Sequence, residues 1–186
     1  MRILVLGSGA REHAIITRLL AEPTEHEIIA APGNAGISAV VPVVALDPTR
    51  GDVVSAYALD NDIELVVIGP EAPLVAGVAD ALRQRGIPVF GPGKAAAALE
   101  GSKTFAKRIM DDAGVPTGRA TRAGTIDEAI EAIDEYGAPY VIKADGLAAG
   151  KGVTICETTA EAVAAVEACM QQRRFGDAGA TIVIEE

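Results

Sequence analysis

The chain has 186 residues, of which 49% are hydrophobic, and a formal net charge of −10. An acidic chain with a pI near 4.7 argues against a broad nucleic-acid-binding or anionic-membrane surface. The two cysteines, Cys156 and Cys169, provide neither a disulfide framework nor a zinc-binding spacing. The sequence shows no signal peptide and no membrane span. We therefore expect a cytoplasmic protein without nucleic-acid or membrane partners.

Strands and helices alternate along the first half of the chain. In chain order, the pattern predicts strands at residues 3–6, 27–31, 40–44, 65–68 and 88–90, and helices at residues 11–21, 52–60 and 74–85. Pro42 interrupts the third strand, which we therefore place at a sheet edge. Such alternation produces βαβ units and a parallel sheet. The expected fold class is α/β, with a Rossmann-like open parallel sheet forming an N-terminal substrate-binding domain over residues 1–100.

The second half of the chain has a different rhythm. It predicts helices at residues 95–100 and 103–112, and strands at residues 118–122, 140–144, 153–156 and 181–184. Two capping boxes, Thr125–Glu128 and Thr158–Glu161, should open further helices that run to residues 136 and 171. Residues 101–186 are thus expected to form an α+β domain. Because the chain stops directly after an apolar strand, we expect this domain to be truncated at its C-terminus.

Two glycines follow the first predicted strand. Gly7 and Gly9 precede a helix, where backbone N–H groups and the helix dipole favour an anion. The dinucleotide-binding fingerprint requires a further glycine where this chain has Glu12, and the acidic residue expected after the second strand is missing. NAD or FAD binding is therefore disfavoured. A phosphate-bearing small substrate and a tight turn without a ligand both stay open, and His13 is a candidate for either anion binding or helix packing.

A second glycine-rich segment, Gly146–Gly152, lies between two predicted strands and contains Lys151. It can fold over phosphate groups, but it is not a Walker A loop, because only three residues separate its first two glycines and a glycine follows the lysine. Lys143 lies in an otherwise apolar strand, where a lysine facing a cleft requires an anion; an exposed strand lysine is the alternative. Lys103 alone would be a solvated helix lysine, but together with Lys143 it suggests two cations around a triphosphate.

Three further loops, at residues 31–36, 69–74 and 90–93, each follow a predicted strand. In an open α/β sheet, ligands bind at the carboxyl ends of the strands. We therefore expect these loops to lie beside the Gly7–Gly9 turn.

Together these segments resemble the glycinamide ribonucleotide synthetase (phosphoribosylamine–glycine ligase) family of the ATP-grasp superfamily. The resemblance covers the whole chain, and its most specific parts are Gly69–Leu74 and Lys143–Gly152. The matching segments are Gly7–Ala14, Ala31–Gly36, Gly69–Leu74, Phe90–Pro92, Glu100–Lys103, Lys143–Gly152 and Ile182–Glu186. The resemblance implies the N-terminal portion of such an enzyme, with a Rossmann-like domain followed by an incomplete ATP-grasp domain.

The resemblance also implies a reaction in de novo purine biosynthesis. ATP would phosphorylate the carboxylate of glycine to a glycyl phosphate. The amine of 5-phosphoribosylamine would then attack it, giving glycinamide ribonucleotide, ADP and phosphate. Phosphorylation supplies the leaving group that a carboxylate lacks, so the enzyme's task is positioning and charge stabilisation. The implied small molecules are ATP, glycine and 5-phosphoribosylamine, with Mg²⁺ bridging the phosphates, and we expect a monomer.

Residue roles follow from the resemblance at matching positions. The residues expected on the ATP side are Lys103, Lys143, Gly146, Gly150, Lys151, Gly152, Glu185 and Glu186. The residues expected on the phosphoribosylamine side are Gly7, Gly9, Glu12, His13, Asn34, Gly69, Pro70 and Glu71. No catalytic residue is assigned. The acidic metal ligands are expected beyond residue 186, so we expect the 186-residue chain alone to be inactive.

Two alternatives stay open beside this function. One is another ATP-grasp carboxylate–amine ligase. The occurrence of Gly69–Leu74 together with the Gly7–Ala14 segment argues against it. The other is a non-catalytic fragment that binds a nucleotide or a sugar phosphate, which the early end of the chain favours.

Overall fold

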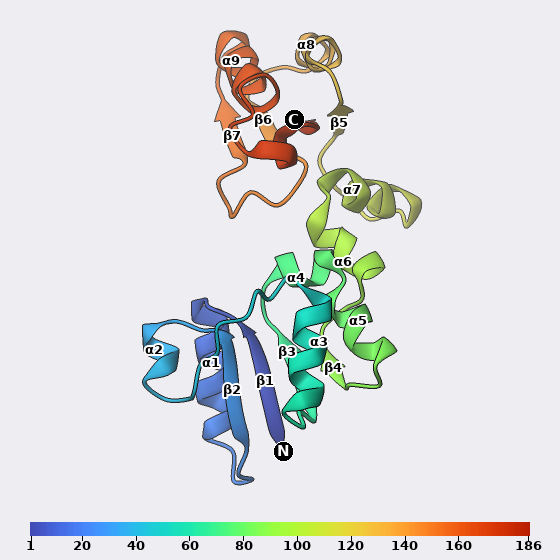
Figure 1. Cartoon of the computed structure of the whole chain (residues 1–186). Helices are drawn as coiled ribbons and strands as arrows, with labels where there is room; N and C mark the ends of the chain where they lie inside the picture. Colours follow the sequence, from blue (N-terminus) through green and yellow to red (C-terminus); the bar gives the residue numbers. More distant parts are fainter. The chain divides into compact units, whose positions relative to one another are not determined.

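The computed structural model describes all 186 residues, which divide into two compact units, Met1–Ala97 and Ala98–Glu186 (Figure 1). Each unit contains its own four-stranded sheet and its own hydrophobic core. No helix in the chain has both the length and the apolar character that crossing a membrane would require.

The sheet of the first unit is parallel, with the strand order β2-β1-β3-β4. Its strands are β1 (Arg2–Gly7), β2 (Glu27–Pro32), β3 (Leu65–Ile68) and β4 (Val89–Phe90). Because all four strands run in the same direction, their carboxyl ends lie along one edge. Gly7 pairs with Pro32 there, and Leu6 pairs with Ile68. This is the edge at which the sequence places a ligand.

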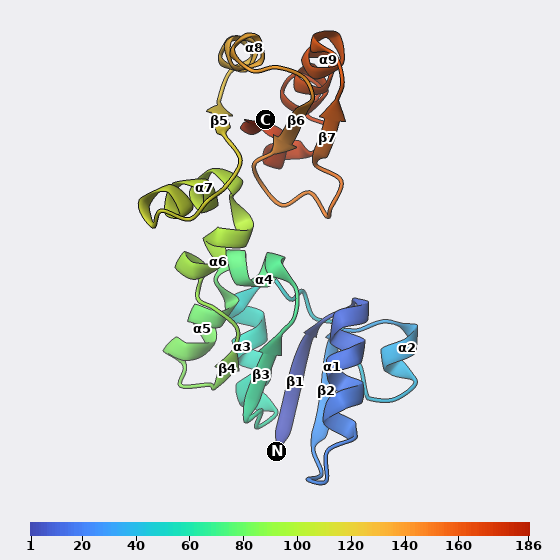
Figure 2. The same cartoon turned by 180° about the vertical axis from the view of Figure 1, so that it is seen from behind.

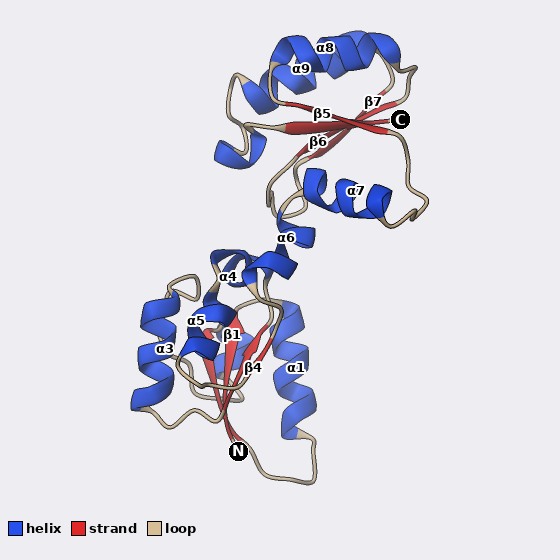
Figure 3. Ribbon diagram, turned by 90° about the vertical axis from the view of Figure 1, so that its right-hand side faces the viewer, coloured by secondary structure: helices blue, strands red, loops and turns tan.

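Helices cover both faces of the parallel sheet, as Figure 3 shows for α1 and α3. The helices are α1 (Ala10–Leu20), α2 (Ala35–Ser38), α3 (Gly51–Asp60), α4 (Glu71–Ala76), α5 (Val78–Gln84) and α6 (Lys94–Gly101), the last running across the boundary between the units. Figure 2 shows α1 in front of β2 with α2 beside it. Leu4 and Leu6 of β1 join the core with α3 and α5, whereas Ile3 and Val5 join the core with α1 and α2. Aliphatic strands of this kind suit a sheet that is buried on both faces.

Two predicted elements of this unit are wrong. Residues 40–44 do not form a strand; Val43 makes only an isolated bridge with Ala30, because Pro42 has no N–H with which to continue a ladder. The helix predicted over residues 74–85 is two helices. Gly77 adopts a left-handed conformation with φ 91°, and it ends α4 and begins α5. The other predicted strands and helices of this unit are confirmed, with ends that shift by one or two residues.

The sheet of the second unit is antiparallel, with the strand order β5-β8-β6-β7. Its strands are β5 (Ala120–Ala123), β6 (Tyr140–Ala144), β7 (Val153–Cys156) and β8 (Ile182–Glu185). Its helices are α7 (Lys103–Asp112), α8 (Ile126–Glu135), α9 (Thr159–Met170) and the short 3₁₀ helix η1 (Gly176–Gly179). Figure 3 shows α8 and α9 on one side of this sheet and α7 on the other. The α/β fold class is confirmed, with a parallel sheet followed by a separate antiparallel one.

Side-chain caps start the two helices that cover this sheet. At α8 the predicted capping box is complete, because Thr125 Oγ1 accepts the N–H of Glu128 at 3.2 Å and Glu128 Oε2 accepts the N–H of Thr125 at 3.2 Å. At α9 only half of the box forms. Thr158 Oγ1 accepts the N–H of Glu161 at 3.2 Å, but Glu161 Oε2 accepts the N–H of Glu157 at 2.8 Å instead of that of Thr158.

Candidate functional site

The carboxyl end of β1 surrounds a buried carboxylate. Glu12 lies in the first turn of α1 and folds back, so that its Oε2 accepts the N–H of Gly9 at 2.7 Å. Its side chain is only 3% exposed. A β-carbon at Gly7, Gly9 or Gly69 would approach the Glu12 side chain to 2.5, 2.8 and 2.1 Å, respectively. The three predicted glycines are therefore needed at this edge because only glycine leaves room for the carboxylate.

Arg11 lies between this buried carboxylate and a second, more exposed one. Arg11 Nε lies 3.5 Å from Glu12 Oε1, which is buried and accepts no hydrogen bond. Arg11 Nη2 donates to Glu71 Oε1 at 2.9 Å, and this hydrogen bond lowers the pKa of Glu71 below its ordinary value. Glu71 is the first residue of α4, which follows β3. Arg11 thus links the loop after β1 to the loop after β3.

Asn34 links the loops after β1 and β2. Its Nδ2 donates to the carbonyl oxygen of Ser8 at 2.7 Å, and its Oδ1 accepts the N–H of Ile37 at 2.9 Å as the N-cap of α2. His13 lies against Gly36, where a β-carbon would come within 2.9 Å of its Cε1. The predicted substrate-side residues thus all lie at the end of β1, in the loops or helix starts after β1, β2 and β3, or in the first turn of α1, namely Gly7, Gly9, Glu12, His13, Asn34, Gly69, Pro70 and Glu71.

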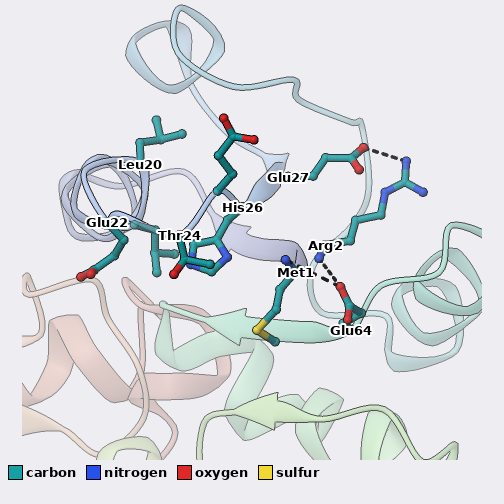
Figure 4. A pocket seen from close by; sticks show the side chains of 10 residues that line it. Met1, Arg2, Leu20, Glu22, Thr24, His26, Glu27 and Glu64 are labelled. Atoms are coloured by element: carbon teal, nitrogen blue, oxygen red, sulfur yellow. Dashed lines mark hydrogen bonds and ion pairs between the residues drawn. The ribbon is translucent and has the colours of Figure 1, made fainter.

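A cavity of about 670 Å³ lies at the other, amino-terminal edge of this sheet (Figure 4). Two of its carboxylates already contact Arg2, which lies 3.0 Å from Glu27 and donates its backbone N–H to Glu64 at 2.6 Å. The loops that carry the predicted site residues do not line it. We therefore assign this cavity no part in the candidate site.

In the second unit, Lys143 lies on the sheet face that α8 and α9 leave uncovered. Ile142, the residue before Lys143, lies on the opposite face and is fully buried in the core with those helices. Residues that pair directly across antiparallel strands share a face. The register places on this face, which α7 partly covers, Val141, Lys143, Val153, Ile155, Val183 and Glu185, with Ala120 and Arg122 of β5. Lys143 Nζ donates to Glu185 Oε2 at 2.5 Å, so the strand lysine predicted to require an anion has one within its own chain.

Lys103, at the start of α7, also reaches this region. Its Nζ donates to the carbonyl oxygens of Ala144 and Gly146, at 2.7 and 3.3 Å. Burial lowers the pKa of Lys103 below its ordinary value, although the negative charge of Asp145 acts in the opposite direction. The structure therefore brings Lys103 and Lys143 to the same end of β6, where the glycine-rich loop begins.

Asp145 attaches the start of α7 to this loop. Its Oδ1 accepts the N–H of Thr104 at 2.7 Å, and its Oδ2 accepts the hydroxyl of Ser102 at 3.1 Å. A carboxylate at a helix N-terminus is stabilised by the N–H groups and the dipole. Sequence reasoning missed Asp145, because an aspartate before a glycine looks like an ordinary turn residue.

The glycine-rich loop, Gly146–Gly152, joins β6 to β7. Its ends are held together, since the N–H of Ala144 donates to the carbonyl oxygen of Gly152 at 2.8 Å. Ala149 and Gly150 both have left-handed backbones, with φ of 49° and 75°, and Lys151 is exposed. The predicted residue Glu186 is exposed as well, and its N–H donates to the carbonyl oxygen of Arg119 at 3.2 Å.

Lys107 is a second residue that sequence reasoning missed. It lies one turn after Lys103 in α7, and its Nζ donates to Thr117 Oγ1 at 2.7 Å and to the carbonyl oxygen of Gly118 at 2.8 Å. The same Nζ lies 3.4 Å from Glu185 Oε1. The available signal was the i, i+4 spacing, which places Lys103 and Lys107 on the same side of one helix.

No group of three or more His, Cys, Asp or Glu side chains in the chain is arranged to hold a metal ion. The acidic groups nearest to the two lysines, Asp145 and Glu185, already accept from α7 and from Lys143. The residues of this chain therefore do not form a magnesium site.

Comparison with known proteins assigns both units to one family. Residues 1–100 match the family model for the N domain of phosphoribosylglycinamide synthetase, and residues 101–186 match the model for its ATP-grasp (A) domain. A phosphoribosylamine–glycine ligase from Leifsonia xyli is 73% identical over 165 residues, which are 88% of this chain and 40% of the relative. One from Mesorhizobium japonicum is 51% identical over 100% of this chain and 44% of its own length.

A solved structure of a phosphoribosylamine–glycine ligase from Thermotoga maritima superposes with a TM-score of 0.77 at 34% identity, over 100% of this chain and 44% of that one. The chain thus spans about two-fifths of the length of the relatives it matches. Since the two family models between them cover every residue, the chain belongs to the phosphoribosylglycinamide synthetase family.

Proposed function

We propose that the protein, in the form that its host makes, joins glycine to 5-phosphoribosylamine at the expense of ATP, giving glycinamide ribonucleotide, ADP and phosphate. The observation that carries this proposal is the convergence of Lys103, Lys143 and the Gly146–Gly152 loop at one end of β6. We further propose that the enzyme is cytoplasmic and monomeric. It would use Mg²⁺, as the family resemblance implies.

The nucleotide would bind to the second unit. Lys103 donates to two carbonyl oxygens and Lys143 to one carboxylate oxygen, so each ammonium group retains at least one N–H for a phosphate oxygen. Backbone N–H groups of the loop would supply further donors. Val153 and Ile155, which are 47% and 68% exposed on the same face, offer an apolar surface to a purine base, next to Glu185.

Phosphoribosylamine would bind to the first unit, at the carboxyl edge of the parallel sheet. The Gly7–Gly9 turn precedes α1, and because Glu12 Oε2 already accepts the N–H of Gly9, a phosphate would bind to the remaining N–H groups of the first turn. Asn34 is exposed and retains one N–H and one lone pair for the hydroxyl or amine groups of an aminosugar, while the buried Glu12 would act by holding Gly9. Arg11 provides positive charge between the two carboxylates of this edge.

The residues fix the chemistry mainly through position and charge. When glycine is phosphorylated, one carboxylate oxygen becomes the bridging oxygen of the glycyl phosphate. Attack by the amine breaks the bond between the acyl carbon and that oxygen, which leaves with the phosphate. The two lysines would stabilise the negative charge that accumulates on the transferred phosphoryl group. No general base is assigned.

An oxygen-labelling experiment tests this function. The protein purified from its host is incubated with ATP, 5-phosphoribosylamine and glycine labelled with ¹⁸O in its carboxylate. We expect one ¹⁸O atom in each phosphate released, and release of ADP only when both co-substrates are present.

Lys143→Met should abolish most of this activity, since it removes a cation from the phosphate site. Arg85→Met removes an exposed cation from the first unit and serves as the matched control. Unlabelled phosphate, or ADP release that another amino acid supports as well as glycine, would refute the assignment.

A further inference from the structure

Lys107 makes two hydrogen bonds and one ion pair within its own chain. A lysine ammonium group has three N–H donors and no acceptor. Thr117 Oγ1, the carbonyl oxygen of Gly118 and Glu185 Oε1 surround the Lys107 Nζ at 2.7, 2.8 and 3.4 Å. The side chain is 17% exposed. The Lys107 ammonium group is thus held by three groups of its own chain, whereas Lys143 Nζ donates to Glu185 alone.

Glu185 is shared between two lysines. Its Oε2 accepts from Lys143 at 2.5 Å, while its Oε1 faces Lys107 at 3.4 Å. The carboxylate is held from both ends and its side chain is only 15% exposed. A partly buried charge is weakly screened. The negative charge of Glu185 therefore affects Lys143 strongly, unless Lys107 balances part of it. With Lys107 present, the three groups together carry one net positive charge; without it, Glu185 would neutralise Lys143.

Apolar packing contributes little to holding α7 on the sheet. No residue of α7 is fully buried, and a cavity of about 200 Å³ remains between α7 and β5 and β8, with Lys107 and Val183 among its walls. Polar contacts therefore hold the helix against the sheet. Lys107 is the contact that joins α7, the segment at Thr117 and β8.

We propose that Lys107 is a positioning residue of the nucleotide site. It does not touch the nucleotide; it fixes Glu185 and shares its charge, so that Lys143 keeps a net positive charge for the phosphates. This inference rests on the proposed ATP-binding function. It predicts that loss of Lys107 weakens ATP binding through Glu185, and so that removing the charge of Glu185 repairs the defect.

The experiment measures the Kd of ATP, and the KM for ATP separately from kcat, for the protein purified from its host. Lys107→Met should raise the Kd about tenfold, with a smaller change in kcat. Adding Glu185→Gln to that variant should tighten ATP binding again, because Lys143 is no longer neutralised. Lys107→Arg should restore most of the affinity. Arg108→Met removes a neighbouring exposed cation from the same helix and should leave the Kd within about twofold.

The outcomes separate the two proposals. If the wild-type protein does not bind ATP, the proposed function and this inference both fail. If the wild type binds ATP and Lys107→Met binds it equally well, only this inference fails. A defect that Glu185→Gln does not relieve would mean that Lys107 contacts the nucleotide, which also overturns it. If Lys107→Met does not fold, Thr117→Val is the second variant, because it removes one partner of Lys107 without changing the charge. The proposal then predicts a rise in the Kd of ATP of about two- to threefold. An unchanged Kd would refute it.

Discussion

A β-carbon on Gly69 would lie 2.1 Å from Glu12 Oε1. The loop after β3 and the first turn of α1 therefore meet through a glycine on one side and a buried carboxylate on the other. Gly7 and Gly9 make the same close approach from the loop after β1. The glycines of this edge thus accommodate a glutamate of the protein itself, which explains why a glutamate stands where a dinucleotide-binding loop would have its third glycine.

This packing predicts the effect of Gly69→Ala. The new methyl group must displace a side chain that is almost completely buried, so the free energy of unfolding of residues 1–97 should fall by about 1–3 kcal/mol. Denaturant-dependent hydrogen exchange at β1 and β3 amides measures it. The clash requires the Glu12 side chain, so Gly69→Ala should cost much less in a Glu12→Ala background. At Gly137 a new β-carbon meets nothing within 4 Å, and equal losses for Gly137→Ala and Gly69→Ala would disprove this explanation.

The left-handed Gly77 predicts a second stability effect. Its φ of 91° divides α4 from α5, and an L-residue in such a conformation costs about 1–2 kcal/mol. Gly77→Ala should therefore destabilise the first unit, even though the nearest atom to the new β-carbon is Lys94 Cδ at 3.5 Å, an ordinary contact. The measurement is hydrogen exchange across α3 and α5. A stabilised variant would show that one continuous helix can form here, as the sequence pattern suggests.

The lowered pKa of Lys103 predicts an alkaline limit to nucleotide binding. Burial is the main cause of the lowering, from an ordinary value of 10.5. The charged form therefore costs stability at neutral pH, and this cost disappears as pH rises through the lowered pKa. Anion binding has the opposite requirement, because phosphate binding needs the charged form. ATP affinity should thus begin to fall at a pH below 10.5.

Titrations of ATP between pH 7.5 and pH 10.5 measure this limit, with Lys103→Arg as the comparison. Arginine keeps its charge to above about pH 12, so the affinity of that variant should begin to fall at a higher pH than that of the wild type. Curves that fall in parallel for both proteins would assign the alkaline loss to another group.

Sequence periodicity predicted the elements well because most of them follow simple patterns. β1 is a continuous aliphatic run, and α8 begins at a complete capping box. The failures have local causes: a proline at residue 42 that prevents a ladder, and a glycine at residue 77 whose φ no pattern reveals.

Some contacts of the candidate site could be predicted from the sequence and others could not. The pairing of Lys143 with an anion was predictable, because a lysine in an apolar strand is costly without one. The contacts of Lys107 were not predictable, because its partners lie far away in the chain. Its hydrogen-bond partner Thr117 is 10 residues away, and its ion-pair partner Glu185 is 78 residues away. The family resemblance predicts Glu12 on the phosphoribosylamine side, but the sequence pattern does not reveal that its side chain is buried. Its actual contact with Gly69 depends on the packing of two separate loops.

The last prediction concerns Asp145, which holds the start of α7. The carboxylate accepts the N–H of Thr104 at 2.7 Å and the hydroxyl of Ser102 at 3.1 Å. Charge-assisted hydrogen bonds at a helix N-terminus are stronger than neutral ones. Asp145→Ala should therefore cost about 1–3 kcal/mol, seen as faster hydrogen exchange at Thr104 and through the first turn of α7. Asp145→Asn keeps one acceptor oxygen and should cost less.

Asp112 provides the matched control at the other end of the same helix. It is exposed at the last position of α7, where a negative charge opposes the helix dipole. Asp112→Ala should leave the exchange of the first turn unchanged or slightly slower. Because Lys103 reaches the glycine-rich loop from this same turn, loosening it in Asp145→Ala should also raise the Kd of ATP, while Asp112→Ala should not. If both variants affect α7 and ATP binding equally, then the helix is held by its overall packing, and Asp145 has no special part in it.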